Sequence, residues 1–459
     1  MRTTAGLPPP GLTAGLPHQV GERLGPDSAT EWGGDLIVAD SLAATAAIAP
    51  APRIGLVRHV GLGLYWLGTY FVVTPVYTIL LQVQISQAVA SHDTQNLVTG
   101  VATGIGGFLA MVIPPLVGHY SDHLHTRWGR RKPILVAGTL GIVLCLVFMR
   151  MASSLPAIVV GFALTVGTIN VAGAAYVAVI PDTVHDAETG RASGFLGLFV
   201  QAGSVLSLIT LLLMSRQHQL LNTYWILIAV LILTLIPSLW AMANAEEKRP
   251  AARAPINLRK FLAPLWTGDF GWATFTRFLN TSAFYSTLPF LLFSFRDLLK
   301  VPDPANFTAT FELLVTATAI PLAIFCGFLS DRYGRKRFVY ASGAISSLVL
   351  LIFMLGPVIS PSVMLLLGVV YGIGYGTYTA VDWALCLDTL PDKEHPAKDL
   401  GLFHVADALP RVGIPLFAGV VLYLFNQVQP LLGYRAIFLM AVLLYIAATV
   451  FVRQIKSVR

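Results

Sequence analysis

The chain has 459 residues, of which 55% are hydrophobic and 12% are charged. A soluble domain carries roughly 25% charged residues, so the composition excludes an ordinary soluble protein. The net charge of +7 does not indicate a nucleic-acid partner, because the basic residues cluster between apolar segments instead of covering one polar face. The three cysteines, Cys145, Cys326 and Cys386, lie in apolar stretches, and we expect no disulfide framework, no metal site and no cofactor.

Residues 1–55 are rich in Pro, Gly and Ala and have no sustained helical period, which predicts a disordered cytoplasmic N-terminal tail. The stretch 36–51 could be mistaken for a signal peptide. Glu31, Asp35 and Asp40 stand where a basic region and an unbroken apolar core would be required, so we do not predict one.

Twelve later stretches are long enough to cross a hydrocarbon core of about 30 Å, and they predict an all-α membrane protein. They lie at 58–84, 98–118, 133–152, 155–180, 192–214, 221–243, 271–296, 308–329, 337–357, 361–386, 402–426 and 433–453. The hydrophilic stretch between the sixth and seventh has Glu, Lys, Arg and Pro and predicts a linker at 244–270. We therefore expect a six-helix bundle at 56–243 and a second at 271–459, which ends in a short cytoplasmic tail.

The loop charges predict the orientation in the membrane. Basic residues crowd both tails and the loops that follow even-numbered segments, whereas the opposite loops have only Arg150, Arg216, Arg296, Lys300 and Arg435. By the positive-inside rule both termini are then cytoplasmic.

One short motif occurs twice, about two hundred residues apart. The first copy reads Gly118-His-Tyr-Ser-Asp122 and continues at Gly129-Arg130-Arg131, and the second reads Gly327-Phe-Leu-Ser-Asp331-Arg332-Tyr-Gly334-Arg335. Its repetition indicates two homologous halves. Glycine allows helices and loops to approach closely, and an acid beside arginines can make charge-assisted hydrogen bonds, so we predict that these residues form a cytoplasmic gate.

These motifs resemble the loop signature of the major facilitator superfamily, whose members are secondary transporters and not enzymes. The longer spacing between Asp122 and Trp128-Gly-Arg-Arg-Lys132, together with the stretches at 178–182, 190–194, 380–385 and 398–403, resembles the sucrose-transporter branch, related to the glycoside-pentoside-hexuronide cation symporters. The resemblance implies two pseudo-symmetric bundles around a central cavity that works by alternating access.

The chain departs from that branch where the coupling acid would stand. The resemblance implies a carboxylate midway along segment four, as in sucrose-type proton symporters, or acids on segments two and four, as in the cation-coupled relatives. Here segment four offers only the amide of Asn170, and residues 98–118 contain no ionisable group. Charges inside a membrane need partners. The charges that we select as coupling candidates all lie in the C-terminal half, at Asp382, Arg277, Asp407 and Arg411.

A sugar requires hydroxyl-matching polar groups and an aromatic face. Midplane residues of these types predict the substrate contacts, which we place at Tyr65, Tyr70, Asn170, Gln201, Asn280, Tyr285, Tyr375 and Trp383. The glycine pairs Gly100 with Gly104 and Gly372 with Gly376 are spaced for close helix contact and not for phosphate binding.

The resemblance thus implies a transporter of the bacterial plasma membrane that moves a sugar or glycoside in symport with H⁺, and we expect it to be a monomer. Efflux of drug-like or lipophilic compounds by proton antiport and uncoupled facilitation stay open as alternatives.

Overall fold

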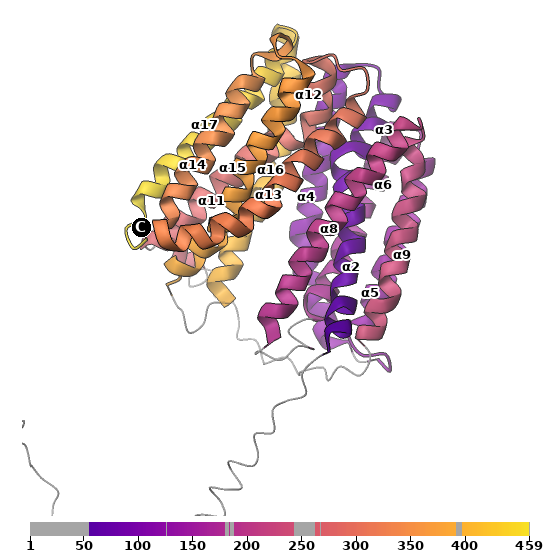
Figure 1. The fold of residues 1–459 in the computed structure, drawn as a ribbon. Coiled ribbons are helices and arrows are strands. Elements are labelled where there is room, and N and C mark those ends of the chain that lie inside the picture. The colour runs from indigo at the N-terminus through magenta and orange to yellow at the C-terminus, as the bar shows by residue number, and fades with distance from the viewer. Residues whose placement is uncertain are drawn as a thin grey trace, which may run out of the picture. The chain divides into compact units, whose positions relative to one another are not determined.

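In the computed structural model, the described residues are 55–458 without 125, 180–182, 184–187, 243–261, 267 and 392–396. The predicted tail at 1–55, except its last residue, and most of the predicted linker lie outside this range. The regular structure of the described residues is helical throughout (Figure 1).

Six membrane-length helices precede the linker and six follow it. The first set comprises α2 (Leu56–Pro75) with the π-helical turn η1 (Val76–Leu80) and α3 (Leu81–Ala88), then α4 (His92–His123), α5 (Lys132–Met151), α6 (Leu155–Val177), α8 (Thr189–Arg216) and α9 (Thr223–Ala241). The second comprises α11 (Gly268–Thr287) with the 3₁₀ turn η5 (Leu288–Phe290) and α12 (Leu291–Asp297), then α13 (Pro304–Tyr333), α14 (Arg335–Phe353), α15 (Pro361–Thr389), α16 (Ala397–Val428) and α17 (Leu432–Phe451). Short 3₁₀ turns η3 (Leu220–Asn222), η4 (Ala263–Trp266), η6 (Gly356–Val358) and η7 (Val452–Gln454) complete the described elements.

Eleven of these spans are long and apolar enough to cross a membrane, counted over the described residues. The remaining one is α11 with α12, which carries Asp269, Arg277 and Asn280 and is interrupted by a turn that contains Pro289. Charged and amide side chains inside a membrane span face the bundle interior or a cavity, so this span is expected to contribute to one.

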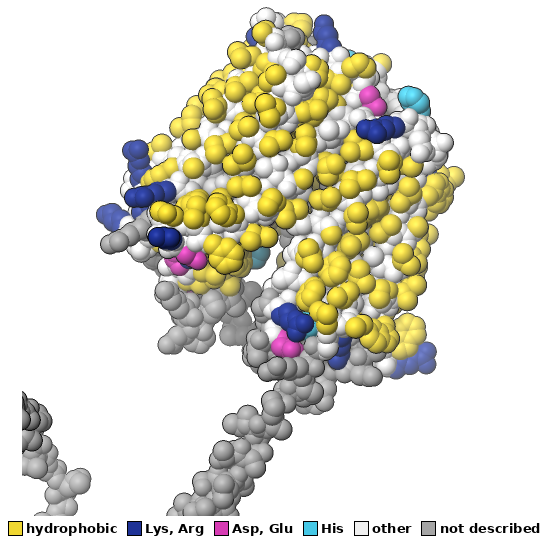
Figure 2. Space-filling view, viewed as in Figure 1, with side chains coloured by type: hydrophobic (Ala, Val, Ile, Leu, Met, Phe, Trp, Pro, Cys, Tyr) yellow, Lys and Arg dark blue, Asp and Glu magenta, His cyan; other side chains and the backbone are white. Residues whose placement is uncertain are grey.

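The two sets of helices form two bundles that lie side by side, with α4 packed along α16 and α8 along α13 (Figure 1). We call the end where α2 begins and α9 and α17 end the tail side, and the end where α3 ends and α4 begins the far side. The bundles meet at the far side and diverge toward the tail side, where Figure 2 shows a notch between them.

Glycines allow the close contact between α4 and α16. A Cβ atom on Gly100 would lie 2.6 Å from the carbonyl oxygen of Pro415, and one on Gly107 would lie 2.4 Å from that of Arg411. Both distances are shorter than any side chain tolerates, so the backbones touch only because these positions lack a side chain. Gly372 and Gly376 play the same part between α15 and α13, with Cβ distances of 2.6 and 2.5 Å to the carbonyl oxygens of Val315 and Ala319. The predicted helix-contact role of these glycines is confirmed.

The outer face of both bundles is hydrophobic. Figure 2 shows apolar side chains over the flanks and basic side chains near the two ends. Leu144, Leu233 and Phe328 are 70%, 69% and 77% exposed, and such a surface is favourable only where lipid covers it. The chain is thus a multi-pass membrane protein.

The duplicated motif takes the same local conformation in both halves. Gly129 has a φ of 85° and Gly334 a φ of 91°, a backbone region that other residues rarely adopt. Each of these glycines therefore turns the chain between two helices. The expectation of close approach is wrong for Gly118 and Gly327, because a Cβ atom on either would meet nothing within 4 Å. Both lie in the tail-side half, where the bundles have diverged.

Candidate functional site

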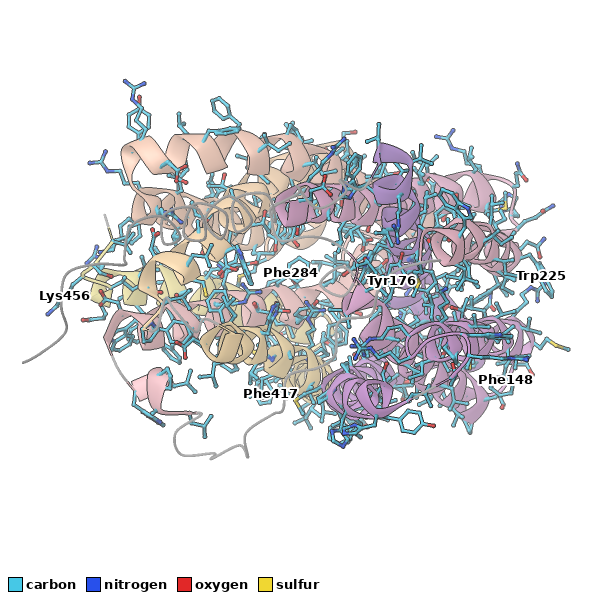
Figure 3. All side chains as sticks on the ribbon, turned by 90° about the horizontal axis from the view of Figure 1, so that it is seen from below. Phe148, Tyr176, Trp225, Phe284, Phe417 and Lys456 are labelled. Carbon is cyan, nitrogen blue, oxygen red and sulfur yellow. The ribbon has the colours of Figure 1, made fainter. Side chains whose placement is uncertain are left out.

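A cavity of about 670 Å³ lies between the two bundles and is lined by residues of both. Figure 3 views the molecule from the tail side. Phe284 is directed toward the space between the bundles, whereas Trp225 lies on the outer surface of the N-terminal bundle. The cavity lies near the middle of the helices, the position at which a transporter of this architecture would hold its substrate.

The N-terminal bundle lines the cavity with neutral polar groups. Tyr70, Asn170 and Gln201 all belong to the lining, as the sequence predicted, and Thr69, Thr74, Thr103 and Ser204 add hydroxyls. The Asn170 amide nitrogen donates to the carbonyl oxygen of Val166 at 2.9 Å, and its amide oxygen is the group that can accept from a ligand. This wall can exchange hydrogen bonds with a hydroxylated ligand and carries no charge.

The C-terminal bundle contributes aromatic rings and charge. Tyr285 and Tyr375, both predicted contacts, line the cavity together with Phe284. The rings of Phe284 and Tyr375 stack with centroids 5.2 Å apart and planes 15° apart. A flat aromatic wall of this kind suits the C–H face of a sugar ring or another flat apolar surface.

Three predicted substrate contacts are not part of this lining. Tyr65 is 1% exposed and shares a 2.7 Å hydrogen bond with Thr139, so it packs inside the N-terminal bundle. Asn280 is 8% exposed and buried in α11. Trp383 lies toward the tail-side end of α15, where its ring is 5.6 Å from that of His404. These three predictions are corrected, because the face of each helix that meets the cavity depends on its rotation in the bundle.

A π-helical turn places two further side chains in the cavity. Pro75 lies inside the first span, just before η1, and Tyr77 and Thr78 of that turn line the cavity. A proline removes one backbone donor, and a π turn accommodates the resulting change of register, which is frequent at functional sites. The sequence analysis did not predict this turn.

The four coupling candidates form one connected cluster in the C-terminal bundle. Arg277 on α11 forms an ion pair with Asp382 on α15, and its second nitrogen lies 3.7 Å from a carboxylate oxygen of Asp407 on α16. Asp407 in turn accepts a 2.5 Å hydrogen bond from Arg411, and Tyr378 donates one to Asp382 at 2.8 Å. Burial of these charges is tolerated because each is paired. Of the four, only Arg411 reaches the cavity lining.

Glu312 on α13 is a cavity residue that the sequence analysis missed. Its side chain belongs to the lining, it is 8% exposed, and its Oε1 atom is buried without a hydrogen-bond partner. A glutamate four residues into a predicted span was the available signal, since an acid inside a membrane segment is a functional candidate by default.

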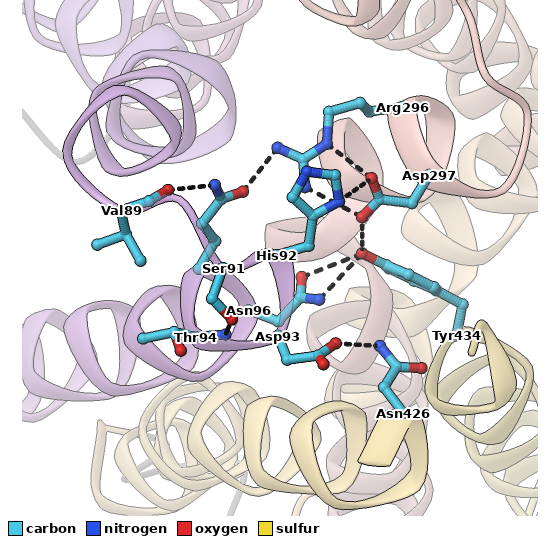
Figure 4. Close-up of polar contacts among 11 residues, drawn as sticks. Val89, Ser91, His92, Asp93, Thr94, Asn96, Arg296, Asp297, Asn426 and Tyr434 are labelled. Atoms are coloured by element: carbon cyan, nitrogen blue, oxygen red, sulfur yellow. Dashed lines mark hydrogen bonds and ion pairs between the residues drawn. The ribbon is translucent and has the colours of Figure 1, made fainter. Parts of the chain in front are cut away.

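Polar side chains join the bundles at the far side (Figure 4). Asn96 on α4 donates to the hydroxyl of Tyr434 on α17 at 2.9 Å, and His92 lies 2.9 Å from a carboxylate oxygen of Asp297 on α12. The remaining members are Arg296 with Gln95 at 2.6 Å, and Asp93 with Asn426 and Gln427 at 3.0 Å each. We call these residues the far-side latch.

At the tail side, the contacts that the structure shows between described residues stay within one bundle. Arg131 donates to Ser121 at 2.8 Å in the first half, and Arg335 pairs with Asp388 at 2.8 Å and with Asp331 at 3.4 Å in the second. Arg130 is buried, whereas Arg332 is exposed, and the side chain of Asp122 lies outside what the structure describes. None of these pairs joins the two bundles, and the gate stays a prediction for the opposite conformation.

Comparison with known proteins places the chain by its sequence and its fold. The family model described as Major Facilitator Superfamily matches residues 59–415 and 310–456. An uncharacterized symporter, sll1374 of Synechocystis sp., is 28% identical over 185 residues. This match covers 35% of the chain and 32% of the relative, so it spans about a third of that protein's length.

The solved structures that share the fold include two transporters. The nucleoside transporter NupG (D323A mutant) has a TM-score of 0.67 at 13% identity, covering 87% of this chain and 100% of that one. A D-xylose-proton symporter has a TM-score of 0.62 at 14% identity, covering 88% and 97%.

Proposed function

The chain belongs to the Major Facilitator Superfamily, and from this premise we propose that it carries a sugar or a glycoside across the bacterial plasma membrane in symport with H⁺. It is a secondary transporter and not an enzyme. The observation that carries the proposal is the cavity, because its N-terminal wall offers hydroxyls and amides without charge and its C-terminal wall offers stacked aromatic rings. A neutral hydroxylated molecule with one apolar face matches both walls.

The relatives support the proposal of symport. The matching curated protein is called a symporter, and one structure with this fold is a D-xylose-proton symporter. Because the solved structures have low sequence identity to this chain, their likeness supports the fold alone. The proposed substrate class therefore rests on the cavity.

We propose further that the tail side is cytoplasmic, on the strength of the basic residues there. The far-side latch then closes the outer entrance, and the conformation is open to the cytoplasm. Alternating access would require the latch to open and the tail side to close.

A binding screen tests the substrate class. The purified protein is melted in detergent with sucrose, other sugars, aryl glycosides, nucleosides and lipophilic cations. A ligand at a hundredfold excess over its Kd stabilises the folded state by about 2.7 kcal/mol, so sugars or glycosides should raise the Tm. Stabilisation by lipophilic cations alone would favour efflux and contradict the proposal.

Two tyrosines five residues apart on α2 provide a matched test of the cavity. Tyr70→Phe removes a hydroxyl from the lining and should raise the Kd for the bound sugar by about 2–12-fold, since a neutral hydrogen bond contributes about 0.5–1.5 kcal/mol. Tyr65→Phe removes a hydroxyl that bonds Thr139, so it should lower stability by about 1 kcal/mol and leave the Kd unchanged. Equal effects of both variants on the Kd would show that this cavity is not the binding site.

A further inference from the structure

We propose that Glu312 is the group that binds the transported proton, and that it takes up and releases this proton as the two bundles meet and part around it. The inference rests on the proposed function, because it names the residue at which the coupling proton is held. It replaces Asp382, the acid that the sequence favoured, by one that lies in the cavity itself.

Glu312 is buried in the cavity wall without a counter-charge. The side chain is 92% buried, since its exposed fraction is 8%, and Oε1 has no hydrogen-bond partner. A carboxylate in this position would be an unpaired buried charge, whereas a neutral acid is tolerated. The geometry therefore suits the protonated form in this conformation.

The groups around Glu312 supply no compensating cation. The elements packed against α13 are α15, α8, α12, α14 and η1. Toward the cavity they present Tyr371 and Tyr375 from α15, only neutral residues from α8, and Tyr77 and Thr78 from η1, and α14 contributes Leu350 and Phe353. Arg296 and Asp297 of α12 are engaged in the far-side latch. Across the cavity, Arg411 donates to Asp407 at 2.5 Å and lies 5.2 Å from the ring centroid of Tyr285.

Thr78 of η1 lines the cavity together with Glu312, and η1 packs against α13. The Thr78 hydroxyl donates to the carbonyl oxygen of Thr74 at 2.9 Å. A hydroxyl has a single hydrogen, so in this arrangement it offers no donor to a Glu312 carboxylate. The neutral acid is therefore the form that this part of the wall accommodates.

The wall around Glu312 is built by both bundles, since α13 packs against η1 and α8, and this links the proton to the conformation. Thr78 belongs to the N-terminal bundle and Glu312 to the C-terminal bundle. Asp382, in contrast, is held by Arg277 and Tyr378 of its own bundle, so a rigid-body motion of the bundles leaves its partners in place. A group shifts a conformational equilibrium only if it interacts differently in the two states, and Glu312 meets this condition.

The proton follows a balanced path. With the far side open, water reaches Glu312 and the carboxylate takes one proton from that side. The neutral acid is then buried between α13 and η1 as the far side closes. Release of the proton to tail-side water leaves a buried carboxylate. Because this carboxylate is unfavourable without hydration, its formation favours reopening of the far side. One proton crosses in each cycle, and with a neutral substrate one positive charge crosses with it.

Infrared spectroscopy tests the protonation without any substrate. A buried carboxylic acid gives a separate carbonyl-stretch band that disappears as it loses its proton. We expect this band in a pH titration of the wild-type protein, its loss in Glu312→Gln, and its retention in Asp382→Asn. A band that persists in Glu312→Gln would overturn the proposal. Thr78→Val should keep the band and shift its titration midpoint, and it serves as a second variant if Glu312→Gln does not fold.

Conformation and transport give the second readout. Spin labels at Ala90 and Val428, two exposed far-side positions, report the opening of that side in a cysteine-free background. The open fraction should rise with pH in the wild type and stay low at every pH in Glu312→Gln. In proteoliposomes, Glu312→Gln should lose accumulation of sucrose against its gradient and retain sucrose exchange. Accumulation equal to that of the wild type would overturn the proposal. If the wild type does not carry sucrose, the proposed substrate fails, while the infrared and spin-label results still decide the role of Glu312.

Discussion

The far side and the tail side of the molecule use their polar residues in opposite ways. At the far side, hydrogen bonds cross from one bundle to the other, as between Asn96 and Tyr434. At the tail side, the described pairs such as Arg277 with Asp382 and Arg335 with Asp388 join helices of the same bundle. The first kind of contact changes when the bundles move, and the second does not. Crossing contacts therefore select the conformation, whereas contacts within a bundle keep that bundle rigid.

The largest expected effect comes from breaking the charge cluster within the C-terminal bundle. Arg277→Met would leave Asp382 buried without its cation. Both side chains are 13% exposed, so we expect a loss of about 3–5 kcal/mol in stability, seen as a lower Tm of the purified protein. The double variant Arg277→Met with Asp382→Asn should recover much of this loss, because no unpaired charge remains.

Arg411→Met is the control for that experiment. The Arg411 side chain is 46% exposed, so water can hydrate the Asp407 carboxylate that it leaves behind, and the loss should be smaller. The double variant Arg277→Met with Asp382→Asn should melt at a clearly higher temperature than Arg277→Met alone. If these two variants melt at the same temperature, the charge cluster is not the rigid core of its bundle that we infer.

A smaller effect on stability and a larger one on conformation are expected at the far side. Tyr434→Phe removes a buried hydroxyl that accepts a hydrogen bond across the bundles from Asn96 at 2.9 Å. The same hydroxyl donates to Asp297 of its own bundle at 2.5 Å, and loss of that bond weakens both states alike. The closed latch should lose about 1–3 kcal/mol, which is roughly a 5–150-fold shift toward far-side-open states. Spin-label distances between Ala90 and Val428 measure this shift.

Tyr445→Phe provides the matched control for the latch. Tyr445 is also buried and shares a 2.8 Å hydrogen bond with Tyr371, but both residues belong to the C-terminal bundle. It should lower the Tm and leave the far-side distances unchanged. Similar distance changes in both variants would mean that crossing contacts do not select the state.

The helices and the charge cluster could be predicted from the sequence. The far-side latch could not, and Glu312 was missed although it lies inside a predicted span. Long apolar segments define spans, and charges inside them must find partners, which is why Arg277, Asp382, Asp407 and Arg411 were selected together. The predicted spans began at 98 and 308, whereas α4 begins at His92 and α13 at Pro304. Those extra turns contain the latch residue Asn96 and place Glu312 deeper than its position in the sequence suggested.

Helix rotation and conformational state were also beyond the sequence. Tyr65 and Tyr70 lie on the same helix, and only packing against α8 and α9 decides that Tyr70 faces the cavity and Tyr65 does not. Both conformations of a transporter share one sequence, so the gate motifs alone could not tell which side is open. The structure answers this, because the bundles diverge toward the tail side (Figure 1).

The smallest effects are expected from the tail-side motif, and they separate its two acids. Asp388 is 39% exposed and lies 2.8 Å from Arg335, whereas Asp331 is 67% exposed and 3.4 Å from the same arginine. Asp388→Asn should lower stability by about 0.5–1 kcal/mol, and Asp331→Asn by close to zero, because exposed pairs contribute little.

The second acid, Asp331, is also predicted to close the tail side in the opposite conformation. In that case Asp331→Asn removes a crossing contact that exists only in the opposite conformation and is absent from the structure described. Asp331→Asn should then leave the Tm unchanged and increase cysteine labelling at Thr316, in the cavity wall, from the tail side. Unchanged labelling would show that Asp331 is not a gate residue. A lowered Tm would show that its pair with Arg335 stabilises one bundle, as the contacts within the C-terminal bundle do.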